Sequence, residues 1–186
     1  MLKLLKKCLE SEKKDKRIFD IVLYGSYTVG KEKPRDIDVL VIFLEGSLRE
    51  RLDSIQEIKG RLKKEIENVD IKQALIQDLF SPAFLARTGM FLTGISIFQE
   101  KNFCEILGFK SFSLFWYNLK GLNHAQKVRF NYILAGRKAK GLIGELEGER
   151  LVSGAVKIPI KNSLVFEEIL KSNKINYKKE NILAEI

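Results

Sequence analysis

The sequence has few of the residues that build disulfide, zinc or histidine-based sites. Its 186 residues include two cysteines, Cys8 and Cys104, and a single histidine, His124. Two cysteines are too few for a disulfide framework or a zinc site, so both are expected to be free thiols. His124 stands at the start of a helical pattern, next to the expected N-cap Asn123, which favours a surface or capping role over catalysis.

Long hydrophobic runs are also missing. No apolar stretch approaches the roughly 20 residues that cross a bilayer, and the lysine-rich start of the chain lacks the apolar core of a signal peptide. The sequence therefore predicts a soluble, cytoplasmic protein without a membrane partner. Hydrophobic residues make up 45% of the chain, enough to bury a sizeable core in one large domain or two small ones.

Aspartate is absent from residues 101–186, and the charge of the chain is uneven as a result. Residues 1–100 contain 18 basic and 16 acidic side chains, a net charge of +2, whereas residues 101–186 contain 15 and 8, a net charge of +7. A strongly basic half suggests a polyanionic partner such as nucleic acid. A lysine-rich solubilising surface is the alternative explanation.

Strand-like and helix-like segments alternate over the first hundred residues, which predicts an α/β or α+β fold built in layers. The expected strands are 17–24, 36–44, 69–76 and 93–99, and the expected helices are 1–16, 47–68 and about 82–89. The helix at 47–68 would connect two strands of the sheet. The sequence leaves open whether those two strands pair in parallel or antiparallel.

The second half has its own pattern. Its expected strands are 112–119, 151–160 with a bend at Gly154, and 175–183, and its expected helices are 123–136 and 163–172. With a glycine-rich connector at 141–149 that can hold a further strand, this order resembles a split β-α-β-β-α-β unit. Many RNA-binding modules and many metabolic domains have that shape. We therefore expect a domain at 1–100 and a small basic α+β domain at 101–186.

Two carboxylates stand at the head of an otherwise apolar strand. Residues two apart on a strand point to the same side, so Asp36 and Asp38 share one face, while the opposite face is apolar from Ile37 to Phe43. Like charges repel, and carboxylates resist burial unless a cation lies between them. A divalent metal with oxygen ligands is the expected cation.

The surroundings of this strand carry a family resemblance. Gly25-Ser26 ends the preceding strand and is followed, after nine intervening residues, by Asp36-Ile37-Asp38, which resembles the signature of the DNA polymerase beta-like nucleotidyltransferase superfamily. The run RDIDVLVIF is similar to archaeal-type CCA-adding enzymes, and the segment 69–99 resembles the latter half of minimal nucleotidyltransferases. The resemblance covers about residues 17–100 and implies an α+β fold with a mixed sheet flanked by helices. Tyr27, Thr28 and Val29 stand where the family often has small or arginine residues, and Arg35 replaces a frequent serine.

The resemblance implies a chemistry. A nucleoside monophosphate would pass from an NTP, with ATP as the first choice, to an acceptor hydroxyl with release of pyrophosphate. Asp36, Asp38 and Asp70 would be catalytic and would bind two Mg²⁺ ions, with Mn²⁺ as an alternative. Asp78 is the fallback for the third acid. Gly25 and Ser26 would bind the nucleotide by holding its β- and γ-phosphates.

Basic residues supply the remaining candidates. Lys31, Lys33 and Arg35 lie in the loop before the acid pair and could screen phosphate charge, although a solvated loop is favoured over a specific contact for any one of them. Arg137, Lys138 and Lys140 are the strongest candidates for nucleic-acid contact in the second half. They follow an aromatic cluster at 112–117 whose side chains either stack on bases or fill a core.

The acceptor is the least determined part of the prediction. The 3′ end of an RNA is favoured, because the second half is basic. The first alternative is a minimal enzyme that adenylylates a partner protein. The second is a non-catalytic scaffold of the same fold that binds nucleic acid.

Overall fold

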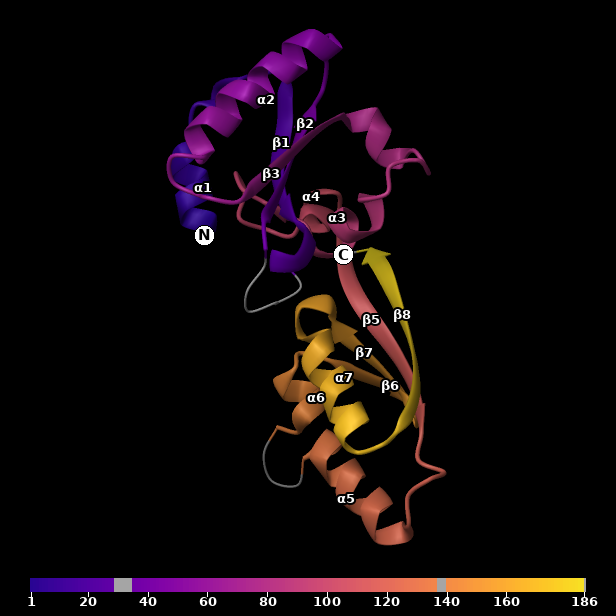
Figure 1. The fold of residues 1–186 in the computed structure, drawn as a ribbon. Coiled ribbons are helices and arrows are strands. Elements are labelled where there is room, and N and C mark those ends of the chain that lie inside the picture. Colours follow the sequence, from indigo (N-terminus) through magenta and orange to yellow (C-terminus); the bar gives the residue numbers. More distant parts are fainter. Residues whose placement is uncertain (29–34, 137–139, 186) are drawn as a thin grey trace. The chain divides into compact units, whose positions relative to one another are not determined.

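The computed structural model describes residues 1–28, 35–136 and 140–185. The chain forms two compact units, Met1–Leu107 and Gly108–Ile186, each with its own four-stranded sheet and core (Figure 1). The first unit has a mixed sheet flanked by helices and the second is also α+β, so the expected fold class is confirmed. Within the described ranges, no helix is long and apolar enough to cross a membrane.

The first unit is built on the sheet β3-β2-β1-β4. Its elements are α1 (Leu2–Cys8), η1 (Glu12–Lys14), β1 (Ile18–Tyr24), η2 (Gly25–Tyr27), β2 (Ile37–Phe43), α2 (Leu48–Leu62), β3 (Val69–Leu75), η3 (Ile76–Phe80), α3 (Arg87–Thr93), β4 (Ile95–Ser96) and α4 (Phe103–Ile106). β1 is antiparallel to both β2 and β4. β2 and β3 are parallel, with α2 as their connection, which settles the pairing that the sequence left open.

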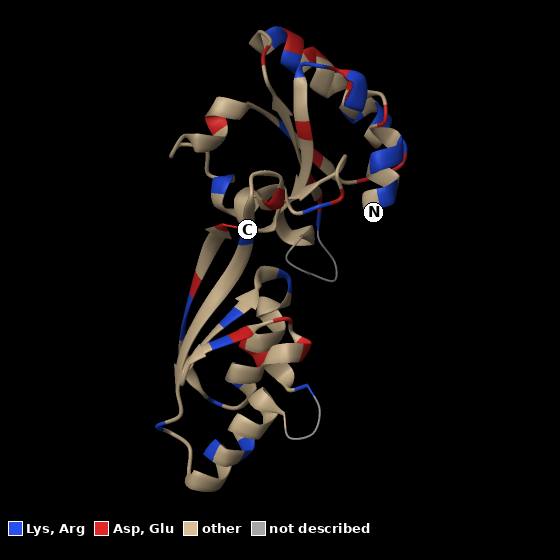
Figure 2. Cartoon of the chain, turned by 180° about the vertical axis from the view of Figure 1, so that it is seen from behind, with Lys and Arg blue, Asp and Glu red and all other residues tan. Residues whose placement is uncertain are grey.

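Both faces of β2 are buried along most of its length. The apolar face that begins at Ile37 packs into a core with the buried side chains of α1 and α2. On the other face, Leu40 and Ile42 pack with Met90 of α3 and Phe103 of α4. Figure 2 shows the charged residues of α1 and α2 along these two helices. The half-buried Asp38 therefore stands where the apolar packing of this second face ends.

Helix α2 begins as predicted and ends early. Ser47 is its N-cap and forms a capping box with Glu50, which fixes the start. The helix ends at Leu62 and not at Asn68, because the amides of Glu65 and Ile66 both bond to the Leu62 carbonyl in a tight turn. Ile66 still reaches the core from that turn, so the apolar stripe continues beyond the helix.

Two predictions after β3 are wrong. The helix expected from Pro82 starts only at Arg87, because the chain first forms η3, where the Asp78 carboxylate accepts the Leu75 amide at 2.9 Å. The strand expected at 93–99 is reduced to β4. Its path is cut short by a turn in which the Glu100 amide bonds to the Ser96 carbonyl at 3.0 Å.

The second unit has the strand order of the expected split unit. Its elements are β5 (Phe109–Asn118), α5 (His124–Ala135), α6 (Leu142–Glu145), β6 (Glu149–Val152), β7 (Ala155–Pro159), η4 (Ile160–Asn162), α7 (Ser163–Ser172) and β8 (Asn176–Glu185). The sheet order is β6-β7-β5-β8, and every neighbouring pair is antiparallel. The single bent strand expected at 151–160 is wrong. Gly154, with a φ of +84°, turns the chain into the hairpin β6–β7.

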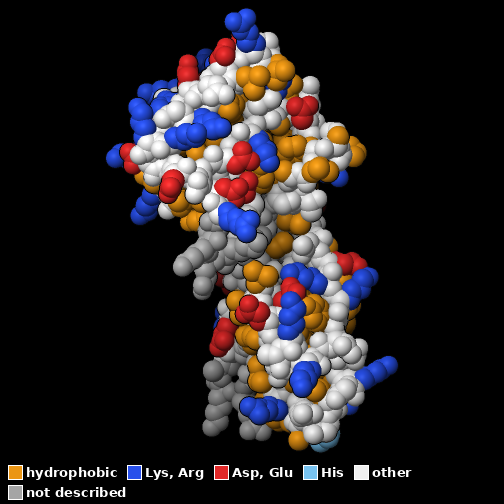
Figure 3. Space-filling view, viewed as in Figure 1, with side chains coloured by type: hydrophobic (Ala, Val, Ile, Leu, Met, Phe, Trp, Pro, Cys, Tyr) orange, Lys and Arg blue, Asp and Glu red, His pale blue; other side chains and the backbone are white. Residues whose placement is uncertain are grey.

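The aromatic run of β5 is divided between the two faces of this sheet. Phe115 and Tyr117 are buried in a core with Phe130 of α5 and Phe166 of α7. Trp116 lies on the other face and is 39% exposed. Alternation therefore assigns one aromatic set to the core. Figure 3 shows basic side chains distributed over the face of this unit that is turned to the viewer.

Candidate active site

The pairing of three strands brings the predicted acids together at one end of the first sheet. Asp38 on β2 is opposite Tyr24 on β1 and opposite Asp70 on β3. Paired residues on neighbouring strands point to the same side of a sheet, so the carboxylates of Asp38 and Asp70 are neighbours. Both are half-buried, and Asp36 lies exposed just before β2. The structure thus collects Asp36, Asp38 and Asp70 from two parallel strands.

These carboxylates act on one another electrostatically. Burial raises the pKa of Asp38, and the negative charges of Asp36 and Asp70 raise it further. The charge of Lys72 lowers the same pKa. The Asp38 carboxylate is therefore held in an environment that favours a nearby cation.

Lys72 and Tyr24 border the acids and were not predicted from the sequence. Lys72 Nζ lies 3.4 Å from Asp70 Oδ2, so this ammonium is a counter-charge for the third acid. Strand alternation from Asp70 to Lys72 was a signal that could have found it. Tyr24 is buried, and burial raises the pKa of its hydroxyl. Its place opposite Asp38 depends on the β1–β2 register, which the sequence does not give.

The Gly25-Ser26 turn packs directly against Asp38. Gly25 has a φ of +80°, and a Cβ at this position would lie 2.1 Å from Asp38 Oδ2. A residue with a side chain would therefore displace the carboxylate, so glycine is required for this approach. The turn is fixed by Thr28, whose amide and hydroxyl donate to the Gly25 carbonyl at 3.2 and 3.0 Å. Ser26 is half-buried within this turn.

The donor chemistry of the acids fits a hard divalent cation. Carboxylate oxygens are the ligands that Mg²⁺ and Mn²⁺ prefer, and Asp36, Asp38 and Asp70 are the residues that would hold such an ion. In the described parts of the chain, no three acidic, histidine or cysteine side chains are grouped tightly enough to enclose a metal as they stand. The close approach of Gly25 to Asp38 brings these donors beside the Gly25-Ser26 turn.

The other candidates of the first unit lie apart from the acids or outside the described residues. Lys31 and Lys33 fall outside them, and Arg35 is exposed just before Asp36. Asp78, the fallback third acid, bonds to the Leu75 amide within η3. Asp70 is therefore the acid that the fold places beside Asp38.

The basic candidates of the second unit are only partly described. Arg137 and Lys138 lie outside the described residues, so their predicted contact with nucleic acid stays a prediction. Lys140 is exposed, and its stem lies against Gly144, where an added Cβ would be 2.7 Å from Lys140 Cγ.

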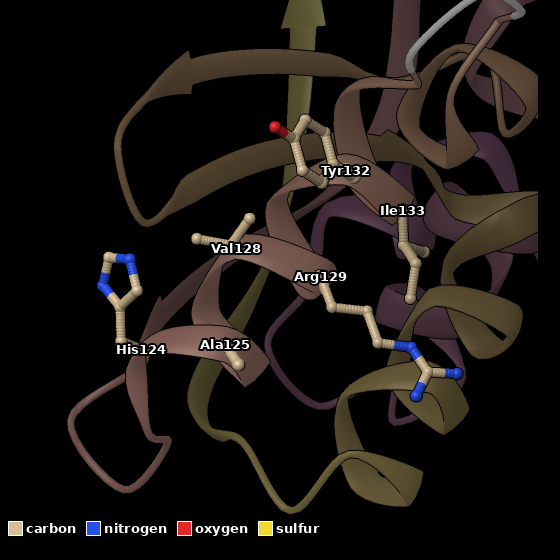
Figure 4. A pocket seen from close by; sticks show the side chains of 6 residues that line it. All are labelled: His124, Ala125, Val128, Arg129, Tyr132 and Ile133. Atoms are coloured by element: carbon tan, nitrogen blue, oxygen red, sulfur yellow. The ribbon is translucent and has the colours of Figure 1, made fainter.

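His124 begins α5, and Asn123 caps this helix by accepting the Gln126 amide at 2.9 Å, as expected. His124 lies at one end of a hollow of about 620 Å³ on the outer side of α5 (Figure 4). The hollow is lined by His124, Ala125, Val128, Arg129, Tyr132 and Ile133. No carboxylate is among these residues, and the acid cluster belongs to the other unit.

Residues 6–82 match the family described as Polymerase beta, Nucleotidyltransferase. The matched segment includes the Gly25-Ser26 turn and all three acids, and it ends before α3. Neither the curated proteins nor the solved structures gave a significant match to the chain.

Proposed function

The chain contains a nucleotidyltransferase domain of the DNA polymerase beta-like superfamily over residues 6–82, and we propose that it transfers a nucleoside monophosphate from an NTP to an acceptor hydroxyl. ATP is the proposed nucleotide and the 3′ end of an RNA is the proposed acceptor. One relationship carries the assignment. Asp38 stands opposite Asp70 on parallel strands while Gly25 packs against the Asp38 carboxylate.

In the proposed reaction, the acceptor oxygen forms a bond to the α-phosphorus and the bond from that phosphorus to the bridging oxygen breaks, so pyrophosphate leaves. Ser26 and the backbone of its turn orient the β- and γ-phosphates. Asp70 accepts the proton of the acceptor hydroxyl. Asp36, Asp38 and Asp70 would hold two Mg²⁺ or Mn²⁺ ions, which would supply positive charge that neutralises the phosphates and makes the hydroxyl more acidic.

The charge distribution supports RNA as the acceptor. Residues 101–186 have a net charge of +7, whereas residues 1–100 have a net charge of only +2. The positive charge of residues 101–186 attracts a polyanion such as RNA. It does not attract protein acceptors as a class. We therefore assign catalysis to the domain at 1–100 and acceptor binding to 101–186, including the basic segment that contains Arg137, Lys138 and Lys140.

Label transfer tests the proposal. The full chain is incubated with each α-labelled NTP, a short single-stranded RNA, a cell protein extract, and Mg²⁺ or Mn²⁺. Labelled RNA lengthened by one or more nucleotides is the expected result with the wild type, and loss of the label is expected with Asp38→Asn. Asp53→Asn is the matched control, because it removes an exposed aspartate from α2.

The other outcomes are equally definite. Label found on a protein and never on RNA would replace the RNA acceptor with the adenylylating alternative. RNA binding without turnover of any nucleotide, with either metal, would leave the non-catalytic scaffold as the function.

A further inference from the structure

The second unit contains a polar cavity of about 490 Å³ bounded by the end of β5, one side of α5 and the β6–β7 turn. Its lining side chains are Tyr117, Asn118, Lys120, Lys127, Arg150 and Ser153, among others. Three of them are cations, and none of the lining residues that the structure describes is an aspartate or a glutamate. This volume lies in the range of about 300–1,000 Å³ that is usual for small-molecule sites.

The three cations of the cavity differ from the five lysines of this unit that have an acidic partner. Five lysines of the unit form ion pairs with glutamates: Lys157, Lys161, Lys171, Lys178 and Lys179. Lys120, Lys127 and Arg150 form none with any residue that the structure describes. Lys127 is also half-buried. A partly buried cation without a counter-charge is unfavourable, so the cavity is suited to an external anion.

The cavity is held by fixed backbone and side-chain contacts. Lys127 and Asn131 lie one turn apart on α5, and the Asn131 amide donates to the Lys127 carbonyl at 3.1 Å. Asn118 accepts the Lys120 amide at 3.3 Å in the turn after β5. The Tyr117 amide donates to the Gly154 carbonyl at 2.8 Å, which joins β5 to the hairpin turn. Donors from separate elements are thus brought to one place before any ligand arrives.

Tyr117 adds a neutral donor to this arrangement. Its residue is 7% exposed, and its hydroxyl is buried without a hydrogen-bond partner in the described parts of the chain. Burial raises the pKa of Tyr117, and the charge of Arg150 lowers it. The ring itself packs edge-on against Phe130, with centroids 5.9 Å apart.

We propose that this cavity binds a phosphate group of a nucleotide or of nucleic acid, with Lys127 and Arg150 as its main charged contacts. Guanidinium and ammonium donors match phosphate oxygens, and an acid-free lining leaves those donors available. All of the residues involved belong to Gly108–Ile186. The proposal therefore stands independently of nucleotide transfer by the first unit.

Binding to the full chain tests the proposal without reference to activity. Inorganic phosphate, AMP and a single-stranded RNA of twelve nucleotides are titrated in EDTA, and the amide resonances of Asn118, Ser153 and Gly154 are followed by NMR. At least one of these probes is expected to shift these resonances. Lys127→Gln and Arg150→Gln are each expected to lower the affinity for that probe by about tenfold, because each removes one charge-assisted contact.

Lys110→Gln is the matched control. It removes a positive charge from the exposed start of β5, outside the cavity lining, and should leave the affinity within about twofold. Tyr117→Phe keeps the ring packing and removes the unpartnered hydroxyl, so the fold should keep its stability while affinity falls. This variant separates a ligand contact from a purely structural role.

The three probes distinguish the source of the phosphate. Binding of phosphate and AMP indicates a nucleotide or phosphorylated metabolite, and binding of RNA alone indicates the nucleic-acid backbone. Either result supports the phosphate site. Failure of all three to shift the resonances overturns it, and so does a wild-type affinity that Lys127→Gln and Arg150→Gln both leave unchanged.

Discussion

Asp38 on β2 stands directly opposite Asp70 on the parallel strand β3. Burial is the main cause that raises the pKa of Asp38, and the negative charge of Asp70 is a further cause. Two half-buried carboxylates in adjacent positions repel each other and weaken the fold. A sheet selected for stability alone would not place them together. Lys72 supplies one positive charge to this pair, and the proposed divalent cation would supply more.

Replacement of Asp38 by asparagine should separate function from stability. Nucleotide transfer should fall by at least about 100-fold, because a proposed metal ligand is lost. In EDTA the unfolding free energy of the same variant should be about 0.5–1 kcal/mol higher, since the repulsion and the burial of a charge are relieved. Activity assays and denaturant titration followed by circular dichroism measure the two effects.

The control for this pair of effects is Asp53→Asn on the exposed side of α2. It should change neither transfer nor stability beyond about 0.5 kcal/mol. Full transfer activity in Asp38→Asn would show that Asp38 has no role in the proposed reaction.

Gly25→Ala should damage the same site through the backbone. The added Cβ would lie 2.1 Å from Asp38 Oδ2, and the φ of +80° is itself unfavourable for alanine. We expect a loss of about 2 kcal/mol or more in unfolding free energy and of most transfer activity. Denaturant titration and label transfer on the same preparation provide the measurement.

Gly60→Ala offers the opposite case. Gly60 lies within α2, and no atom would be within 4 Å of an added Cβ. This substitution should stabilise the protein by about 0.5–1 kcal/mol, because alanine loses less backbone freedom in a helix. Equal effects of the two alanine variants would show that the contact with Asp38 is unimportant.

The acid pair and its strand could be predicted because they depend on local pattern. The alternation of side-chain direction along a strand fixes which residues of 36–43 share a face, whatever the strand pairs with. The cap of α2 at Ser47 is local in the same way, since Glu50 completes the capping box three residues later. The sequence of strands and helices in the second half was likewise sufficient to predict a split unit.

The features that could not be predicted depend on partners distant in sequence. Tyr24 borders the acids only because of the β1–β2 register, and the phosphate-suited cavity joins β5, α5 and the β6–β7 turn. The position of α3 was missed for a different reason. The Asp78 side chain favours a 3₁₀ turn before Pro82, and propensity alone had favoured a helix after it.

Glu167 should make the second unit sensitive to acid. Burial alone would raise its pKa, but hydrogen bonds from Lys171, Lys179 and Tyr177 lower the pKa to about 2. A depressed carboxyl pKa stabilises the fold above the unfolded value of 4.5, and this stabilisation is lost as the pH falls towards 2. Screening by solvent limits the effect to about 1–2 kcal/mol.

Fluorescence can follow this change, because Trp116 is the only tryptophan and lies in the second unit. Glu167→Gln should lower the unfolding free energy of that unit at pH 7, and the difference from wild type should shrink below pH 4. Glu168→Gln, at the exposed neighbouring position, is the control and should have little effect at any pH. A pH-independent difference for Glu167→Gln would refute the ionic explanation.

Lys72→Gln should change how the acid cluster responds to divalent cations. Lys72 Nζ lies 3.4 Å from Asp70 Oδ2 and lowers the pKa of Asp38, so it supplies positive charge to the same carboxylates that would hold a metal. Its removal should lower the stability of the protein in EDTA by about 0.5–1 kcal/mol. It should also tighten the binding of Mn²⁺ about threefold to tenfold, because a competing cation is lost.

Paramagnetic broadening by Mn²⁺ and thermal unfolding with and without EDTA measure these two effects. Lys64→Gln, which removes an exposed positive charge just after α2, should change neither. The two expected effects have opposite signs, and this is the decisive point. If Lys72 served only the fold, its removal would weaken both stability and metal binding. Weaker Mn²⁺ binding in Lys72→Gln would therefore indicate that the ammonium positions Asp70 and does not compete with the cation.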